Sequence, residues 1–377
     1  MLASGALRAP VRARVLLPAD YAESPERRFP VLYLMHGGFG RACDWTERGD
    51  AERITAAAPL IVVMPGCGNG GWCTDWHNGG RGGPPMWETF HIRQLIPWVD
   101  ASYRTIPGRA GRAIAGTSTG GFCAMSYAAR HPDLFAWAGS FSGAVDIVHN
   151  GPVAAVIGAE AIADGGGRQD VFGSRRANLI TWRAANPCDL AGNLRGLTLY
   201  LATRSGQPER GRRADFVEEQ IYEMNLAFRR RLLELDIDHV WHDRGPGRHA
   251  WPHWQADLRD SLPLMLATFA CPPAAPSAFS YTSAAQAYEV YGWRVTLRRP
   301  VTDFSTLDVT GRGGFAVTGV GDADVVTPPG SRHRVRIQAG ESARDEEATA
   351  DDQGVLHPWV ALGAGGPALA AVTIGGG

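Results

Sequence analysis

Short apolar runs alternate with longer segments of helical periodicity between about residue 11 and residue 271. Several runs are hydrophobic at nearly every position, which is typical of strands buried on both faces of a largely parallel sheet. The runs predicted as strands are VRARVLL, FPVLYLMH, PLIVVMP, GRAIAG, WAGSFSG, LTLYLAT and HVWHD. Apolar residues at three- and four-residue spacing predict helices over 88–100, 120–130, 215–235 and 252–269. This alternation predicts a doubly wound α/β sheet.

Two parts of the chain depart from this alternation. Residues 144–190 contain a GGG triplet and few strand-like runs, so we expect an insertion or cap over the sheet there. After CPPAAPSA (271–278) the chain has short β-type runs and no clear helix, which predicts a small all-β, sandwich-like domain. We therefore expect an α/β domain over 1–271 and a β-rich domain, without a candidate catalytic cluster, over 272–377.

The composition narrows the classes of function. The chain has 377 residues, of which 45% are hydrophobic and 20% charged, as in a soluble globular protein with a full core. A net charge of −1 gives no electrostatic case for nucleic acid or an anionic membrane, and no apolar stretch approaches the ~18 residues of a membrane helix. The chain contains no lysine, which excludes Schiff-base and Walker-type chemistry.

The cysteines and the N-terminus bear on the cellular compartment. Six cysteines are too sparse for a disulfide scaffold in a chain of this length, and no CxxC pair indicates a metal site. Cys67 and Cys73 are close enough in sequence to form a disulfide, and free thiols are the alternative. The N-terminus lacks an apolar signal region, so we expect a cytoplasmic protein, or a secreted one if a leader has been trimmed.

The stretch GTSTGGF (116–122) follows the predicted strand GRAIAG and enters the helix expected at 120–130. Gly116 and Gly120 flank Ser118 in a G-x-S-x-G pattern. A tight strand-to-helix turn needs such neighbours because the serine backbone is strained. The pattern alone also fits an ordinary small-residue turn. Its place between a strand and a helix favours Ser118 as a nucleophile at a helix N-terminus, where the dipole stabilises an oxyanion.

A glycine-rich turn, HGG at 36–38, directly follows the predicted strand FPVLYLM. Backbone N–H groups in such a turn can point at a substrate carbonyl. In a site of this kind one oxyanion donor follows the nucleophile and the other comes from an upstream loop. The predicted donors are therefore the N–H groups of Thr119 and Gly38. This chemistry requires no metal and no organic cofactor.

A base is expected on a loop near the end of the α/β region. His249, within RGPGRHAW (244–251), follows the strand HVWHD and precedes a helix, so it suits a general base that takes the Ser118 proton. His253 is expected inside that helix as a packing residue, and His242 and Asp243 are weaker alternatives.

An acid should lie between the strand LTLYLAT and His249 in the chain. The residues directly after that strand, RSGQPER, include no aspartate. The residues alone leave four carboxylates open as the acid: Glu209, Asp215, Glu218 and Glu219.

Six segments are long enough to compare with known families: FPVLYLMHGG, VVMPGCGNGGWCTDW, WETFHIRQLIPWV, GTSTGGFCAMSYAARHPDLFAWAGSFSG, ADFVEEQIYEMNLAFRRRL and GRHAWPHW. They resemble the esterase D-type α/β-hydrolases, and most of all the branch that contains the mycolyltransferases and their actinobacterial esterase relatives. The resemblance covers residues 11 to about 270. It implies an α/β-hydrolase fold, Ser118 as nucleophile, His249 as base, and oxyanion donors at Gly38 and Thr119.

The resemblance also bears on the acid and on the substrate site. In that branch the acid is a glutamate a few residues into the helix after the strand, a position that Glu218 matches, with Glu209 second. Trp251, two residues after His249, matches a tryptophan of the family and is expected to line the acyl or alcohol site.

The chain departs from the mycolyltransferases in its first oxyanion loop. Those enzymes carry an aspartate and an arginine that hold trehalose, and this chain has His36 and Phe39 there. The departure favours a hydrolase and leaves Phe39 as a substrate contact. We also expect the glycine- and tryptophan-rich segment 66–87 to contribute to the substrate site through Asp75 and Trp76, the alternative being a disordered loop.

Together these features predict a serine esterase that uses Ser118, His249 and Glu218 through an acyl-enzyme. Its substrate would be a small-molecule, lipid or polymer ester. An acyltransferase with the same triad is the first alternative, and a non-catalytic binding protein on a hydrolase scaffold is the second.

Overall fold

The structure, a computed structural model, describes residues 1–79, 85–209, 211, 213–297, 303–310, 315–318, 323–326, 330–339, 342–352, 354–356 and 370–376. The chain forms two compact units, Met1–Ala274 and Ala275–Gly377. None of the helices that the described residues form is long and apolar enough to cross a membrane.

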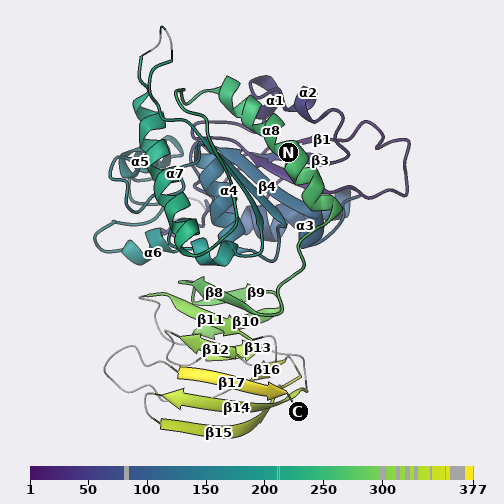
Figure 1. Ribbon diagram of the computed structural model, residues 1–377, viewed down its shortest axis with the longest axis vertical. Coiled ribbons are helices and arrows are strands. Elements are labelled where there is room, and N and C mark those ends of the chain that lie inside the picture. The colour runs from purple at the N-terminus through teal and green to yellow at the C-terminus, as the bar shows by residue number, and fades with distance from the viewer. Residues whose placement is uncertain are drawn as a thin grey trace. The chain divides into compact units, whose positions relative to one another are not determined.

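The first unit is built on a largely parallel sheet (Figure 1). Every predicted strand is present in this sheet. The strand order is β1-β3-β2-β4-β5-β6-β7, with β1 antiparallel to β3 and the other neighbours parallel. This confirms the predicted doubly wound α/β sheet. The strands are β1 (Ala13–Leu16), β2 (Val31–Met35), β3 (Ile61–Pro65), β4 (Arg112–Thr117), β5 (Trp137–Phe141), β6 (Thr198–Thr203) and β7 (Val240–Asp243).

Each predicted helix is also present, with the segment 88–100 divided into a π-helical and an α-helical part. The α-helices of this unit are α1 (Asp44–Glu47), α2 (Ala51–Thr55), α3 (Ile96–Ser102), α4 (Thr119–Arg130), α5 (Val153–Ala163), α6 (Leu179–Arg183), α7 (Phe216–Glu234) and α8 (Trp251–Ala270). The other helical turns are the π-helix η1 (Thr89–Leu95) and the 3-10 helices η2 (Arg109–Gly111) and η3 (Ala191–Leu194).

Helices cover both faces of the sheet, which explains why β2 and β3 are buried at every position. Leu32 of β2 and Ala113 of β4 share one core with Leu258 and Met265 of α8. Successive strand residues point to opposite faces. Gly116 of β4 therefore lies on the other face, where it contacts the start of α4. The loops that lead to helices on both faces start at the carboxyl ends of the parallel strands. Ligands of open α/β sheets bind at this edge.

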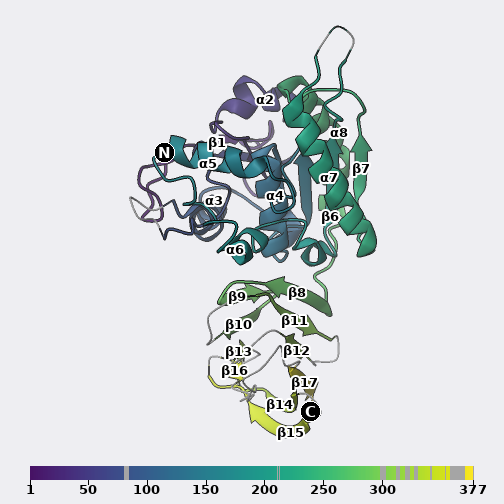
Figure 2. The same cartoon turned by 90° about the vertical axis from the view of Figure 1, so that its left-hand side faces the viewer.

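The stretch 144–190, predicted as an insertion or cap, contains helices α5 and α6 and no strand. In Figure 2, α5 lies toward the N-terminus and apart from α7, with α4 between the two helices in that view. Asp164, just after α5, accepts hydrogen bonds from the backbone N–H of Asn69 at 2.9 Å and of Gly70 at 3.3 Å. This stretch therefore packs on the loop that follows β3.

The second unit consists of small antiparallel sheets, in agreement with the all-β prediction. The described sheets have the orders β16-β13-β10-β9, β12-β11-β8 and β15-β14-β17. In β11, buried and partly exposed residues alternate, so one face of the strand packs on a core that includes Val290, Leu307 and Val335. The strands are β8 (Phe279–Ser283), β9 (Ala287–Val290), β10 (Trp293–Leu297), β11 (Ser305–Val309), β12 (Phe315–Thr318), β13 (Ala323–Val326), β14 (Arg332–Ala339), β15 (Ser342–Thr349), β16 (Val355–Leu356) and β17 (Ala370–Gly376).

Candidate active site

Ser118 occupies a strained turn between β4 and α4. Its φ is 55° and its ψ is −124°, a combination that few residues other than glycine adopt. A methyl group on Gly116 would lie 2.3 Å from the carbonyl oxygen of Gly120, and one on Gly120 would lie 2.5 Å from the carbonyl oxygen of His36. The two glycines are therefore required by close backbone approach, and the turn holds the partly exposed Ser118 above the strand ends.

The predicted oxyanion loop lies against this turn. A methyl group on Gly37 would be 3.2 Å from Cβ of Ser118, and one on Gly38 would be 3.2 Å from Oγ1 of Thr119. The structure thus brings Gly38 and Thr119, the two predicted amide donors, next to each other and next to the serine.

His36 holds the predicted oxyanion loop through two hydrogen bonds. Its Nε2 accepts a hydrogen bond from the backbone N–H of Cys67 at 2.9 Å, so Nδ1 carries the proton and donates to the carbonyl of Gly37 at 2.7 Å. Burial lowers the pKa of His36, which keeps the ring neutral and preserves this pattern. His36, one of the two positions that differ from the mycolyltransferases, therefore links this loop to the loop that follows β3.

His249 and Glu218 form a buried hydrogen-bonded pair. Nδ1 of His249 lies 2.6 Å from Oε2 of Glu218, and Glu218 is fully buried on α7. Oε1 of Glu218 accepts hydrogen bonds from the Ser142 hydroxyl at 2.6 Å and from the backbone N–H of Arg204 at 3.0 Å. Because Nδ1 donates to the carboxylate, Nε2 of His249 is left as the free acceptor. It is buried and has no hydrogen-bond partner among the described residues.

Asp215 joins the start of α7 to the histidine loop. As the N-cap residue, it accepts hydrogen bonds through Oδ1 from the backbone N–H of Val217 at 3.1 Å and of Glu218 at 3.2 Å. Its Oδ2 accepts from the backbone N–H of His249 at 3.2 Å. Burial opposes the ionisation of Asp215, but these hydrogen bonds outweigh it and lower its pKa. Asp215, one of the four candidate acids, thus positions both members of the His249–Glu218 pair.

Ser118 and His249 line the same cavity, which has a volume of about 510 Å³. Gly38, Phe39 and Trp251, each expected at the site, also line it. Phe39 is 57% exposed and has a φ of 53°. Trp254 also lines the cavity, and the sequence analysis did not predict it. Its ring contacts that of His249 edge to face, with centroids 4.9 Å apart. The other lining residues are Gly37, Gly40, Asp44, Arg48, Ala250 and Pro252.

Asp75 and Trp76, expected as substrate contacts, do not line this cavity. The carboxylate of Asp75 accepts hydrogen bonds from the backbone N–H of Thr89 at 3.0 Å and from its hydroxyl at 2.6 Å, so it anchors η1. Trp76 is 4% exposed and donates from its indole to the carbonyl of Gly71 at 3.3 Å. Both have structural partners. Residues 80–84 of the segment 66–87 lie outside the described residues.

The alternative candidates for base and acid lie elsewhere. His253, in α8, faces Glu209 with Nε2 and Oε1 3.7 Å apart, and neither lines the Ser118 cavity. The ring of His242 packs on Tyr200 with centroids 5.0 Å apart. Asp243 accepts a hydrogen bond from Tyr222 at 2.6 Å, and Glu219 accepts one from Gln207.

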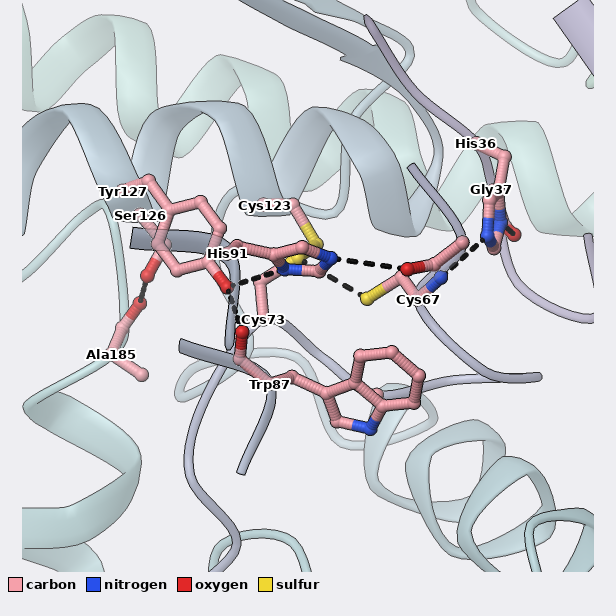
Figure 3. Close-up of a disulfide and its surroundings, with 12 residues drawn as sticks. His36, Gly37, Cys67, Cys73, Trp87, His91, Cys123, Ser126, Tyr127 and Ala185 are labelled. Atoms are coloured by element: carbon pink, nitrogen blue, oxygen red, sulfur yellow. Dashed lines mark hydrogen bonds between the residues drawn. A yellow bond between two sulfur atoms is a disulfide. The ribbon is translucent and has the colours of Figure 1, made fainter. Parts of the chain in front are cut away.

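Both expectations for Cys67 and Cys73, a mutual disulfide or two free thiols, are wrong. Cys73 forms a disulfide with Cys123 of α4, and Cys67 is a buried free thiol (Figure 3). The sulfur atoms of Cys67 and Cys73 still lie 3.4 Å apart. Pairing depends on which cysteine the folded loop meets, and here the loop packs on the helix that follows Ser118. The disulfide therefore ties the 66–79 loop to that helix.

Two groups of residues have donor atoms close enough to consider as metal ligands. Among the described residues these are Cys67, Cys73 and His91, and a second group of Cys43, Asp44 and Glu47. The first group has lost one ligand, because the sulfur of Cys73 is in a disulfide. His91 is engaged by the hydroxyl of Tyr127 at 2.9 Å (Figure 3).

Residues 4–265 match the model of a family described as "Putative esterase". The chain belongs to this esterase family. Within this family, the chain is 37% identical over 249 residues to an esterase of Mycobacterium tuberculosis (strain H37Rv), across 63% of this chain and 52% of that protein. The chain thus spans about half the length of this relative. It is also 30% identical over 294 residues to the diacylglycerol acyltransferase/mycolyltransferase Ag85B of Mycobacterium leprae, across 70% of this chain and 88% of that protein.

Solved structures place the first unit in the α/β-hydrolase fold. The structure of MPT51 (FbpC1) from Mycobacterium tuberculosis matches with a TM-score of 0.60 and 21% identity, over 71% of this chain and 97% of that one. An S-formylglutathione hydrolase from Agrobacterium tumefaciens matches with a TM-score of 0.58 and 17% identity, over 72% and 93%. These matches confirm the predicted fold class of the first unit.

Proposed function

We propose that this esterase hydrolyses carboxylic esters through an acyl-enzyme formed on Ser118, with His249 as base and Glu218 as the acid that orients it. The single observation that carries the proposal is the 2.6 Å contact between His249 and Glu218. The contact engages Nδ1 and leaves Nε2 of His249 without a hydrogen-bond partner among the described residues, and His249 lines the same cavity as Ser118. The family membership and the strained serine turn support the same assignment.

The first half of the reaction forms the acyl-enzyme. Oγ of Ser118 attacks the ester carbonyl carbon while Nε2 of His249 takes the hydroxyl proton. The carbonyl oxygen becomes an oxyanion that the backbone N–H groups of Gly38 and Thr119 stabilise. When the intermediate collapses, the bond to the alcohol oxygen breaks, and the imidazolium returns the proton to the leaving alcohol.

The second half regenerates the enzyme. A water molecule attacks the acyl carbon, His249 takes one of its protons, and collapse returns that proton to Oγ of Ser118 with release of the carboxylic acid. Glu218 stabilises the imidazolium in both halves and is itself held by Ser142 and the backbone of Arg204. Phe39 and Trp251 supply the apolar walls against which acyl or alcohol groups pack.

Short p-nitrophenyl esters test this proposal. The wild type should release p-nitrophenol, and Ser118→Ala should lower kcat/KM by several orders of magnitude. Cys271→Ser, which changes an exposed residue near the end of the first unit, is the matched control and should leave the rate unchanged. A Ser118→Ala protein that keeps a near wild-type rate would rule out the proposal.

Acyl transfer to an alcohol or sugar is the second candidate, because a mycobacterial relative named as an acyltransferase is 30% identical. The two functions share the acyl-enzyme and differ only in whether water or an alcohol resolves it. His36 is engaged by Gly37 and Phe39 is apolar, so neither position offers the trehalose-holding groups expected of a mycolyltransferase, and this departure favours water. Product analysis with and without added alcohols or sugars separates them: an acylated acceptor in place of free acid would favour transfer.

A further inference from the structure

The side chain of Glu160 fills the space beside two glycines of the active-site region. Glu160 belongs to α5 and is 2% exposed. A methyl group on Gly38, the predicted oxyanion donor, would lie 1.8 Å from Oε1 of Glu160, and one on Gly70 would lie 2.3 Å from Oε2. The carboxyl group therefore packs directly against the backbone that presents the oxyanion donor.

Among the described residues, this carboxyl group has no counter-charge. Its Oε2 is buried and has no hydrogen-bond partner among the described residues, and none of their arginines or histidines forms an ion pair with it. A buried carboxylate that lacks a partner is costly, whereas the neutral acid is tolerated.

The neighbours of Glu160 on each surrounding element are neutral or acidic. Asp164 lies on the same side of the cap, one turn further along the chain, and raises the pKa of Glu160. The loop after β3 contributes the Trp72 indole and the Cys67 thiol, whose own pKa burial raises to about 12. The oxyanion loop contributes the neutral His36, and the start of α4 contributes the hydroxyl of Thr119 next to Gly38.

Burial is the largest influence on Glu160. Burial raises the pKa of Glu160 to about 8. The indole of Trp72 lowers this pKa by a smaller amount, and the negative charge of Asp164 raises it further. At neutral pH the group is therefore mostly a carboxylic acid, and it ionises in the mildly alkaline range.

We propose that Glu160 is a positioning residue of the oxyanion loop that supports ester cleavage only as a neutral acid, so that its ionisation suppresses turnover at alkaline pH. The inference rests on the proposed function, since it requires an oxyanion beside Gly38. As a neutral acid, Glu160 packs against the loop without opposing the charge that develops there. As a carboxylate, it places a negative charge beside the developing oxyanion and competes for the N–H of Gly38.

The pH profile of kcat/KM tests the proposal on the full chain. The rate is compared within each protein between about pH 7 and pH 9.5, on either side of the Glu160 titration. The wild type should lose on the order of tenfold over this interval, and Glu160→Gln, which retains the shape and cannot ionise, should change by less than about twofold. Glu52→Gln, at an exposed position of α2, is the matched control and should lose activity as the wild type does.

Three outcomes would overturn the proposal. They are an equal alkaline loss of kcat/KM in Glu160→Gln and the wild type, no alkaline loss in the wild type, or a Glu52→Gln control that keeps its activity at alkaline pH as Glu160→Gln does. Spontaneous ester hydrolysis is subtracted with Ser118→Ala. That protein also separates the two proposals, because full activity in Ser118→Ala defeats the proposed function, whereas a wrong pH profile defeats only the role of Glu160.

Thermal unfolding gives a second readout that does not depend on turnover. The folded protein holds the Glu160 proton between the usual pKa of a glutamate, 4.5, and about 8, whereas the unfolded chain has lost it. The wild type should therefore lose stability relative to Glu160→Gln as the pH rises from about 5 to about 8, and the difference should then level off. A difference in Tm that is independent of pH over this range would contradict a neutral buried acid.

Discussion

Oε2 of Glu218 lies 2.6 Å from Nδ1 of His249, and the second oxygen of the same carboxylate is held by Ser142 and the backbone of Arg204. Three donors thus converge on one fully buried carboxylate. The histidine ring is thus oriented by a carboxylate whose other oxygen, Oε1, is held by two further donors.

Glu218→Gln should lower kcat by about 10²–10⁴-fold, because an amide that donates to Nδ1 favours the wrong tautomer of His249. Glu209→Gln is the matched control, since Glu209 faces His253 outside the Ser118 cavity, and it should stay near the wild-type rate. Steady-state kinetics on a short-chain ester measure both. The reverse result, with Glu209→Gln inactive and Glu218→Gln active, would assign the acid to Glu209.

The two oxygens of Asp215 have separate tasks, one capping α7 and the other holding the backbone of His249. Asp215→Ala should lower the free energy of unfolding by about 1 kcal/mol and also reduce kcat. Asp215→Ser should recover most of the stability and less of the activity, because a single hydroxyl can cap the helix but cannot also reach His249. Denaturant unfolding and kinetics on the same preparations test this. Equal recovery of both quantities would mean that the contact with His249 has no effect on turnover.

Gly38 and Glu160 should be coupled energetically, since a methyl group on Gly38 would overlap the carboxyl group. Gly38→Ala should destabilise the protein, and Glu160→Ala should relieve part of that loss by opening space. A double-mutant cycle on the free energy of unfolding should give a coupling of at least about 1 kcal/mol. Additive effects of the two substitutions would show that the carboxyl group does not pack on Gly38 in solution.

The parts of the fold that sequence predicted best are those fixed by local rules. Apolar runs such as FPVLYLMH and PLIVVMP became strands because both faces of the sheet are covered. The turn at Ser118 was recognisable because its backbone angles and close contacts exclude side chains at Gly116 and Gly120. The segment DFVE also carries a local signal, an aspartate followed three residues later by a glutamate at a helix start, which marks Asp215 as the cap.

The features that sequence missed depend on which distant segments meet in three dimensions. Cys73 pairs with Cys123 across a separation of 50 residues, although Cys67 is far closer in sequence. Asp75 and Trp76 belong to a segment rich in glycine and tryptophan, but in the fold Asp75 anchors the start of η1 and Trp76 bonds within its own loop. Glu160 lies in a helix that carries no sequence motif. Its proposed role depends only on its contact with Gly38, which the sequence does not reveal.

The disulfide between Cys73 and Cys123 should contribute about 2–4 kcal/mol to the free energy of unfolding, because it closes a long loop in the unfolded chain. The double variant Cys73→Ser/Cys123→Ser removes it without leaving a thiol beside Cys67. Denaturant unfolding under non-reducing conditions, compared with Cys271→Ser, measures the loss. An unchanged midpoint in the double variant would indicate that the two cysteines are not joined in solution.

The most direct test of the central claim is covalent labelling by a fluorophosphonate, which phosphonylates an activated serine with loss of fluoride. The wild type should gain the mass of one phosphonyl group, and peptide mapping should locate it on Ser118. His249→Ala should react much more slowly, and Ser118→Ala should not react. Labelling of Ser118→Ala at the wild-type rate, or a folded wild type that takes up no label, would contradict the assignment of Ser118 as the nucleophile.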